Sequence, residues 1–207
     1  MKRTCLRSCL CVLFLASGCY TFSSFQTARL LSRGRYEVTP SYSSVNLSNE
    51  GSSQSMTDNW GVQVGCGLTD QANLRFRYER LESAFDGSEG YNYLAFGPKF
   101  GLIKDRAACG FPVGLYWGAD LDTPDTWHIQ PTLYLTKGLG RTVEITVAPS
   151  YLMFPKEGAD DWVALNVGLG FGSDLTKWAV RPEIGFLKNP GEEGHYSSWG
   201  LAISVVR

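Results

Sequence analysis

Residues 72–79 read ANLRFRYE, and apolar and polar side chains alternate along the whole stretch. One set of alternate positions holds Ala72, Leu74, Phe76 and Tyr78, and the other holds Asn73, Arg75, Arg77 and Glu79. Successive side chains of a β-strand point to opposite faces. The stretch therefore predicts a strand with one apolar face and one charged face.

The same period of two recurs along the chain after Gly34. Such stretches are centred near residues 40, 63, 76, 96, 113, 131, 147, 167, 182 and 201. The 23 glycines, 6 tryptophans, 10 tyrosines and 11 phenylalanines suit strands joined by tight turns, and no long apolar stretch has the 3.6-residue period of a helix. The chain is therefore predicted to be all-β, with about ten strands.

The connections between these stretches alternate in length. LTDQ, IKDR, KGLGR and SDLTK are short, whereas SNEGSSQSMTD, SAFDGSEG, DLDTPD, PKEGADD and NPGEEGH are longer. Tight turns at one end, longer polar loops at the other and an even strand number are typical of transmembrane barrels. A sheet that spans hydrocarbon must also close on itself, because the lipid offers no hydrogen-bond partners to an open edge.

Residues 34–207 accordingly resemble the outer-membrane β-barrel proteins of Gram-negative bacteria, although no single family is identified. The resemblance implies an antiparallel up-and-down barrel with its apolar face toward lipid and its longer loops outside the cell. One departure is the end of the chain at Arg207, since such barrels usually end on an aromatic residue. The alternative is a soluble, lipocalin-like lipoprotein whose apolar face surrounds a ligand.

Two observations favour the membrane barrel. Tryptophans near the longer-loop ends predict an aromatic girdle at the membrane interface, and these are Trp60, Trp117, Trp127, Trp162 and Trp199. The polar face predicts a lumen charge network of Arg75, Arg77, Glu79, Lys99, Asp120, Glu144, Arg181 and Glu183. Because a barrel of this size is near the limit that side chains can fill, we expect these charges to plug the lumen together with Tyr91, Tyr93, Tyr116 and Tyr134.

The N-terminus has the layout of a secretory leader. Lys2, Arg3 and Arg7 precede an apolar run that is too short to span a bilayer. Residues 15–19, LASGC, resemble the bacterial lipobox, which implies cleavage before Cys19 and attachment of acyl chains such as palmitate to it. We therefore expect a signal peptide at 1–18, a periplasmic tether at 19–33 and a barrel at 34–207, with a periplasmic N-terminus.

Loss of the leader leaves Cys66 and Cys109 as the remaining thiols, and we expect both to be free because three strand spacings separate them. No cysteine or histidine spacing suggests a metal site or a cofactor. The mature chain has 16 basic and 20 acidic residues, so a nucleic-acid partner is not expected.

His195 and Ser197 form the one candidate catalytic pair. Both fall on the apolar face of a predicted strand, where the imidazole could take the hydroxyl proton. The His-x-Ser spacing is similar to that of outer-membrane phospholipase A and of the lipid A deacylase, but the residue that orients the histidine in those enzymes has no counterpart after Ser197. A lipid esterase is therefore the alternative function.

The first hypothesis is a lipid-anchored, monomeric, non-enzymatic outer-membrane barrel with a structural or surface-interaction role. Its expected partners are outer-membrane lipid and either lipopolysaccharide or another ligand at the cell surface.

Overall fold

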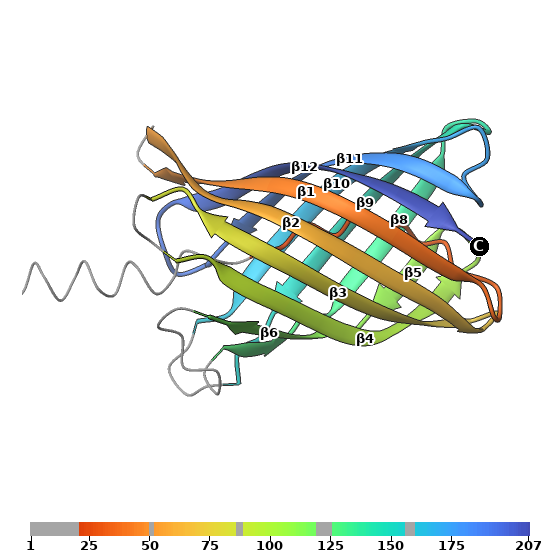
Figure 1. Ribbon diagram of the computed structural model, residues 1–207, viewed down its shortest axis with the longest axis horizontal. Helices are drawn as coiled ribbons and strands as arrows, with labels where there is room; N and C mark the ends of the chain where they lie inside the picture. Colours follow the sequence, from red (N-terminus) through yellow and green to blue (C-terminus); the bar gives the residue numbers. More distant parts are fainter. Residues whose placement is uncertain (1–20, 50–51, 86–88, 119–125, 156–159) are drawn as a thin grey trace, which may run out of the picture.

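The computed structural model describes residues 21–49, 52–85, 89–118, 126–155 and 160–207 (Figure 1). No helix within these ranges is long and apolar enough to cross a membrane. The strands are β1 Tyr36–Asn49, β2 Ser52–Thr69, β3 Ala72–Ser83, β4 Tyr91–Ile103, β5 Ala107–Gly110, β6 Val113–Trp117, β7 Trp127–Ile129, β8 Thr132–Gly138, β9 Val143–Leu152, β10 Trp162–Phe171, β11 Trp178–Lys188 and β12 His195–Val206.

These strands form a closed antiparallel barrel. Strands that follow one another in the chain are paired, except that β4 pairs with both β5 and β6, β5 with β8, and β6 with β7; the pairing of β1 with β12 completes the ring. β5 and β6 are two parts of one barrel strand, as are β7 and β8, because Pro112 and Pro131 interrupt them and lack a backbone N–H. The barrel therefore has ten strands, and the predicted fold class is confirmed.

The two ends of the barrel differ. β2 and β3, β4 and β5, β8 and β9, and β10 and β11 are joined at the end where β12 finishes, which we call the short-turn end. The other connections lie at the opposite, long-loop end. There β1 and β2 continue as paired strands through most of the expected first loop, from Asn46 paired with Ser55 to Asn49 paired with Ser52. The side chains from Ser52 to Ser55 are polar and exposed, and a shift of register between Val45 and Asn46 separates this paired segment from the rest of the wall.

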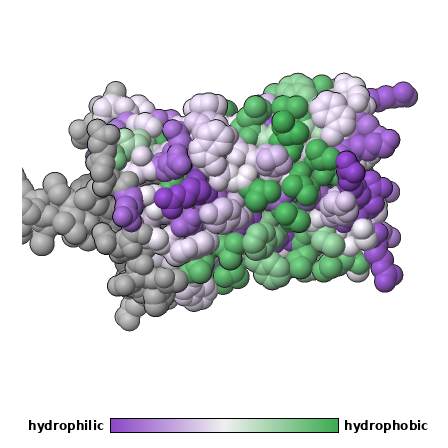
Figure 2. All heavy atoms as spheres, in the orientation of Figure 1, coloured by the Kyte–Doolittle hydropathy of each residue, from purple (hydrophilic) through white to green (hydrophobic). Residues whose placement is uncertain are grey.

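Apolar side chains face outward, as the sequence predicts. Phe96 is 51% exposed and Ile184 is 53% exposed, whereas Lys99, Glu79 and Glu144 are at most 1% exposed. Figure 2 shows hydrophobic side chains gathered over the barrel surface, with hydrophilic groups toward its ends. A soluble lipocalin-like barrel would have the opposite arrangement, so that alternative is wrong.

The expected tryptophan girdle needs one correction. Trp60, Trp127 and Trp199 are exposed at the outer surface, and the ring of Tyr42 lies 4.6 Å from Trp60 and 5.5 Å from Trp199. Trp162 is instead buried at 6% exposure. It shares the strand face of Ala164 and Asn166, which point into the lumen, so its position near a loop did not decide its direction.

Residues 21–31 lie inside the barrel, as an irregular segment between its walls (Figure 1). Phe22, Phe25 and Ala28 are at most 3% exposed. We call residues 21–31 the plug. The sequence predicted a tether outside the barrel for this part of the chain, and the structure places it in the lumen because the strand residues around it supply its hydrogen-bond partners.

Candidate functional site: the plugged lumen

The plug runs from the long-loop end to the short-turn end. Its first residue, Thr21, donates its backbone N–H to the hydroxyl of Tyr116, which is one residue from the long-loop end of β6 (3.1 Å). At the other end, Asn73 lies beside the β2–β3 turn. With its amide oriented to satisfy both of its polar atoms, Asn73 accepts from the N–H of Leu31 (2.8 Å) and donates to its carbonyl (3.1 Å). The plug is therefore antiparallel to β1, which follows it.

Every third residue of the plug is a buried apolar side chain, and these residues are Phe22, Phe25, Ala28 and Leu31. Phe22 joins an apolar cluster near the long-loop end, together with Val45, Leu152, Phe154, Trp162, Ala164, Leu187 and Tyr196. Ala28 packs lower in the lumen against Ala108, Tyr134 and Ala148. The apolar side chains of the plug thus pack against apolar patches of the wall, between the polar groups that line the rest of the lumen.

Two glycines on the lumen face make room for the phenylalanine rings. A Cβ atom at Gly185 would lie 2.8 Å from the Phe22 ring, and one at Gly200 would lie 2.5 Å from the Phe25 ring. Real Cβ atoms essentially never approach so closely, so a larger residue at either position would displace the plug or the wall. Gly67 makes room for backbone at the other end of the plug, since an added Cβ would lie 2.1 Å from the carbonyl oxygen of Ser32 and 2.7 Å from that of Leu31.

Wall side chains accept hydrogen bonds from the N–H groups of the plug. Glu183 on β11 accepts from the N–H of Ser24 (2.5 Å) and of Phe25 (2.8 Å), and also from the Ser24 hydroxyl (2.9 Å). Thr136 on β8 accepts from the N–H of Ala28 (2.7 Å). A segment without regular secondary structure needs such partners when it is buried, because an unpaired buried backbone group costs free energy.

Other wall side chains donate to the carbonyl groups of the plug. Asn166 donates to Phe22 (2.7 Å) and Gln63 donates to Ser24 (3.0 Å). The ammonium group of Lys99 donates to the carbonyls of Thr27 and Arg29, and it also lies 4.7 Å from the centre of the Tyr134 ring. Lys99 is thus held by plug carbonyls and an aromatic face.

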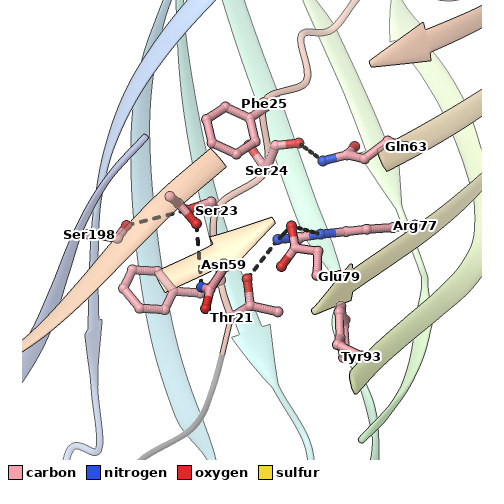
Figure 3. A network of polar contacts seen from close by, with 12 residues as sticks. Thr21, Ser23, Ser24, Phe25, Asn59, Gln63, Arg77, Glu79, Tyr93 and Ser198 are labelled. Carbon is pink, nitrogen blue, oxygen red and sulfur yellow. Dashed lines mark hydrogen bonds and ion pairs between the residues drawn. The ribbon is translucent and has the colours of Figure 1, made fainter. Parts of the chain in front are cut away.

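The remaining charges form ion pairs on the lumen side. Arg75 pairs with Glu37, and Arg77 pairs with Glu79 at 2.6 Å. Figure 3 shows Arg77 and Glu79 next to Thr21, whose hydroxyl accepts a hydrogen bond from Arg77 (2.8 Å).

Glu144 is the centre of a three-residue cluster. Its carboxylate binds Arg181 at 2.9 Å and Arg29 of the plug at 2.8 Å, and it has no exposed side-chain surface. Gly170, on the neighbouring strand, leaves space for this cluster, since an added Cβ would lie about 3 Å from both Glu144 and Arg181.

Aromatic side chains close the region beside the start of the plug. Tyr93 and Tyr116 have ring centres 4.6 Å apart, and His128 stacks against both at 5.8 and 5.5 Å. Tyr93, Tyr116 and Tyr134 are buried in the lumen as predicted, and Tyr91 packs against the same cluster. The alternation puts His128 on the polar face of its strand with Gln130 and Thr132, but His128 was not among the residues predicted to fill the lumen.

Little space remains inside the barrel. A cavity of about 40 Å³ lies beside the plug, between residues that include Ser24, Lys99 and Tyr134. A water molecule needs roughly 10–15 Å³ of such space, so this cavity holds only a few waters. A wider space of about 360 Å³ lies toward the short-turn end, and Arg29, Arg35, Lys104 and Lys177 are among its lining residues.

Seven of the eight residues predicted for the lumen network face the lumen and bind one another, the plug or Glu37. Asp120 lies outside the described residues, as does Cys19. The sequence argument missed Glu37 as the partner of Arg75, and it missed the plug altogether. The three-residue spacing of Phe22, Phe25, Ala28 and Leu31 is the sequence signal that could have indicated a buried face in this segment.

The candidate catalytic pair faces outward, on the side of Trp199, as the alternation predicted. His195 contacts the ring of Phe186, with 6.2 Å between ring centres. In the part of the chain that the structure describes, no hydrogen bond or ion pair joins His195 to Ser197 or to the nearby Glu192 and Glu193. The two side chains share a face, but they are not arranged as an activated nucleophile and its base.

Cys66 and Cys109 are both free thiols, as predicted. Among the described residues, no group of three or more histidine, cysteine or acidic side chains is arranged to hold a metal ion.

Comparisons with known proteins give similarity at the level of the fold. No family model matches the chain, and no curated protein matches it. Among solved structures, the chain is similar to Ail, the attachment invasion locus protein of Yersinia pestis, with 12% identity and a TM-score of 0.42 over 84% of this chain and 99% of that one. An outer-membrane channel from Pseudomonas putida F1 has 11% identity and a TM-score of 0.48, over 90% and 100% of the two chains. The translocator domain of the autotransporter NalP from Neisseria meningitidis has 10% identity and a TM-score of 0.45, over 84% and 89%. These structures are outer-membrane β-barrels.

Proposed function

We propose that this protein is a lipid-anchored, non-enzymatic barrel of the bacterial outer membrane, closed by its own N-terminal segment, with a structural or surface-interaction role. The observation that carries the proposal is the occupied lumen. The plug lies in the barrel from Thr21 to Leu31, and wall side chains from seven strands bind its backbone.

The outer surface supports residence in a membrane. Exposed leucine, isoleucine, valine and phenylalanine side chains cover the outside of the barrel, and charged side chains are paired inside. Apolar area of this extent gains free energy only when it is removed from water, at roughly 25 cal/mol per Å². The closed ring of strand pairs also meets the requirement that a membrane-spanning sheet leave no open edge.

Fractionation and lipid labelling test the membrane location and the anchor. We expect the wild-type protein to stay in outer-membrane fractions after an alkaline wash and to incorporate labelled palmitate. The Cys19→Ala variant should lose the label, whereas the matched Cys66→Ala variant should keep it. Release of the wild-type protein by the alkaline wash would contradict an integral barrel, and equal labelling of both variants would contradict an anchor at Cys19.

Conductance in planar bilayers tests closure of the lumen. The wild-type protein is expected to give no large steady current, because beside the middle of the plug only a cavity of about 40 Å³ remains. A variant that lacks residues 21–31 but keeps Cys19 should conduct ions. Large steady currents through the wild-type barrel would refute the closed lumen.

A lipid esterase built on His195 and Ser197 is the second candidate. Its support is that both side chains face the lipid side of β12, where an acyl substrate would lie. Hydrolysis of phospholipid or lipopolysaccharide acyl esters by the wild-type protein, and its loss in Ser197→Ala, would establish this activity. Ser198→Ala is the matched control, since Ser198 points into the lumen toward Ser23. Absence of hydrolysis by the wild-type protein would remove the candidate.

A further inference from the structure

We propose that the N-terminus of the mature chain leaves the barrel at the long-loop end, so that the plug crosses the membrane inside the lumen and the acyl chains of Cys19 lie in the outer leaflet. The proposal rests on the proposed lipid anchor for the position of the acyl chains. The direction of the chain is argued separately, from the described residues alone. The proposed position of the N-terminus differs from the periplasmic N-terminus that the sequence predicted.

The contacts of the plug change in one direction along its length. Phe22 packs with Val45, Leu152 and Leu187, near the ends of β1, β9 and β11 at the long loops. Ala28 binds Thr136, two residues before the end of β8 at the short turns. Each step along the plug therefore moves toward the short-turn end.

The last residues of the plug and the chain that follows them give the same direction. Arg29 pairs with Asp105, which lies in the short turn between β4 and β5. The N–H of Gly34 donates to the carbonyl of Gly67 near the β2–β3 turn (2.9 Å), and Gly34 has a φ of +77°, a left-handed conformation that suits glycine. The chain turns there and enters β1, which returns through the wall toward the long loops.

The two ends of the plug lie at different levels of the wall. Thr21 binds Tyr116, which is in register with Tyr93 and Glu79, and Leu31 binds Asn73. Glu79 and Asn73 are six residues apart on β3, or about 20 Å along the strand. Residues 21–31 therefore pass along much of the wall from the long-loop side toward the short-turn end.

Cys19 lies two residues before Thr21, so at full extension it reaches about 7 Å from Thr21. That distance is far shorter than the path back to the short-turn end. In bacterial outer-membrane barrels the short turns face the periplasm and the longer loops face outside. While the plug is in place, acyl chains on Cys19 can therefore reach the outer leaflet but not the periplasmic one.

An epitope tag tests the position of the N-terminus. A short tag inserted between Tyr20 and Thr21 should bind antibody on intact cells, to an extent comparable with a tag inserted at residues 86–88 of a long loop. The same tag inserted between Arg33 and Gly34, at the short-turn end, is the matched control and should bind only after permeabilisation. Binding of the Tyr20 tag only after permeabilisation would overturn the proposal.

A disulfide tests the position of the plug without a tag. The hydroxyls of Ser23 and Ser198 lie 3.4 Å apart, so cysteines at both positions should cross-link in intact cells under mild oxidation. Ser204 lies on the same strand and faces the same lumen, but six residues, or about 20 Å, toward the short-turn end. The pair Ser23→Cys and Ser204→Cys is therefore the control. Cross-linking of the control pair in place of the first pair would contradict the threading described here.

The two proposals fail in different ways. A hidden Tyr20 tag on a protein that still incorporates palmitate would reject the outward N-terminus and keep the anchor. An exposed Tyr20 tag on a protein without palmitate would reject the anchor and keep the threading.

Discussion

The carboxylate of Glu183 binds the plug residue Ser24 twice, through its backbone N–H at 2.5 Å and through its hydroxyl at 2.9 Å. The two residues are 159 positions apart in the chain. The same carboxylate accepts a third hydrogen bond from Phe25. A wall side chain thus accepts the backbone hydrogen bonds that a neighbouring strand would accept in a sheet. Such side-chain partners allow an irregular peptide to be buried in the lumen.

Glu183→Gln should destabilise the barrel. The amide keeps one acceptor oxygen but turns an NH₂ group toward donors, so at least one hydrogen bond to the plug is lost at a cost of about 1–3 kcal/mol. Denaturant unfolding of the folded protein in micelles measures the change. Glu193→Gln, on an exposed residue of the β11–β12 connection, is the control and should leave the midpoint unchanged. Equal midpoints for wild type and Glu183→Gln would show that the plug contacts are not made.

Gly200→Ala should loosen the plug, because its Cβ would lie 2.5 Å from the Phe25 ring and 2.6 Å from the backbone carbonyl of Tyr42. Overpacking of this kind costs roughly 1–3 kcal/mol. Gly168→Ala is the matched change, since its Cβ would meet Glu183 only at an ordinary 3.4 Å. The unfolding midpoints of both variants and their bilayer conductance are the measurements. A Gly168→Ala variant as unstable as Gly200→Ala would argue against a steric role for the plug.

Glu144→Ala should be more damaging than the same change in an exposed acid. It leaves Arg181 buried without its partner, and breaking a buried pair in this way costs about 3–5 kcal/mol. Adding Arg181→Met to Glu144→Ala should recover part of that loss, because the unpaired charge is removed. Additive losses in the double variant would mean that the two residues are not coupled.

Denatured, unreduced mature protein should contain two reactive thiols per chain, from Cys66 and Cys109. Cys66 is exposed on the outer face of β2 and Cys109 lies on β5, with β3 and β4 between them. Thiol titration gives the count, and the Cys66→Ala variant should give one. A wild-type count of zero would contradict the free thiols.

Much of the fold could be predicted because one local rule applies along the whole barrel. Alternation in residues 72–79 assigns Arg77 and Glu79 inward and Phe76 and Tyr78 outward, and the structure agrees for each of them. The ten strand centres also lie within the ten barrel strands. The prediction was wrong for Trp162, because it was based on the position of Trp162 near a loop and not on the alternation of side chains, which puts Trp162 on the lumen face of its strand.

The lumen residues were predicted as a set, but their partners were not. The alternation along a strand tells whether Lys99 or Glu183 faces the lumen or the lipid. It does not tell which residues of other strands or of the plug lie opposite them. Lys99 was expected to pair with acids, whereas it binds the carbonyls of Thr27 and Arg29.

By itself, the sequence determined the strands, their number, the two faces of the wall and the unequal ends, because each of these follows from side-chain period and loop length between near neighbours. The threading of residues 21–31 was decided only by the tertiary structure. The plug has no regular secondary structure, and its backbone groups are satisfied by side chains that lie tens of residues or more away in the chain. Its position is therefore a property of the closed barrel, which brings Glu183, Lys99, Asn166 and Thr136 around one axis.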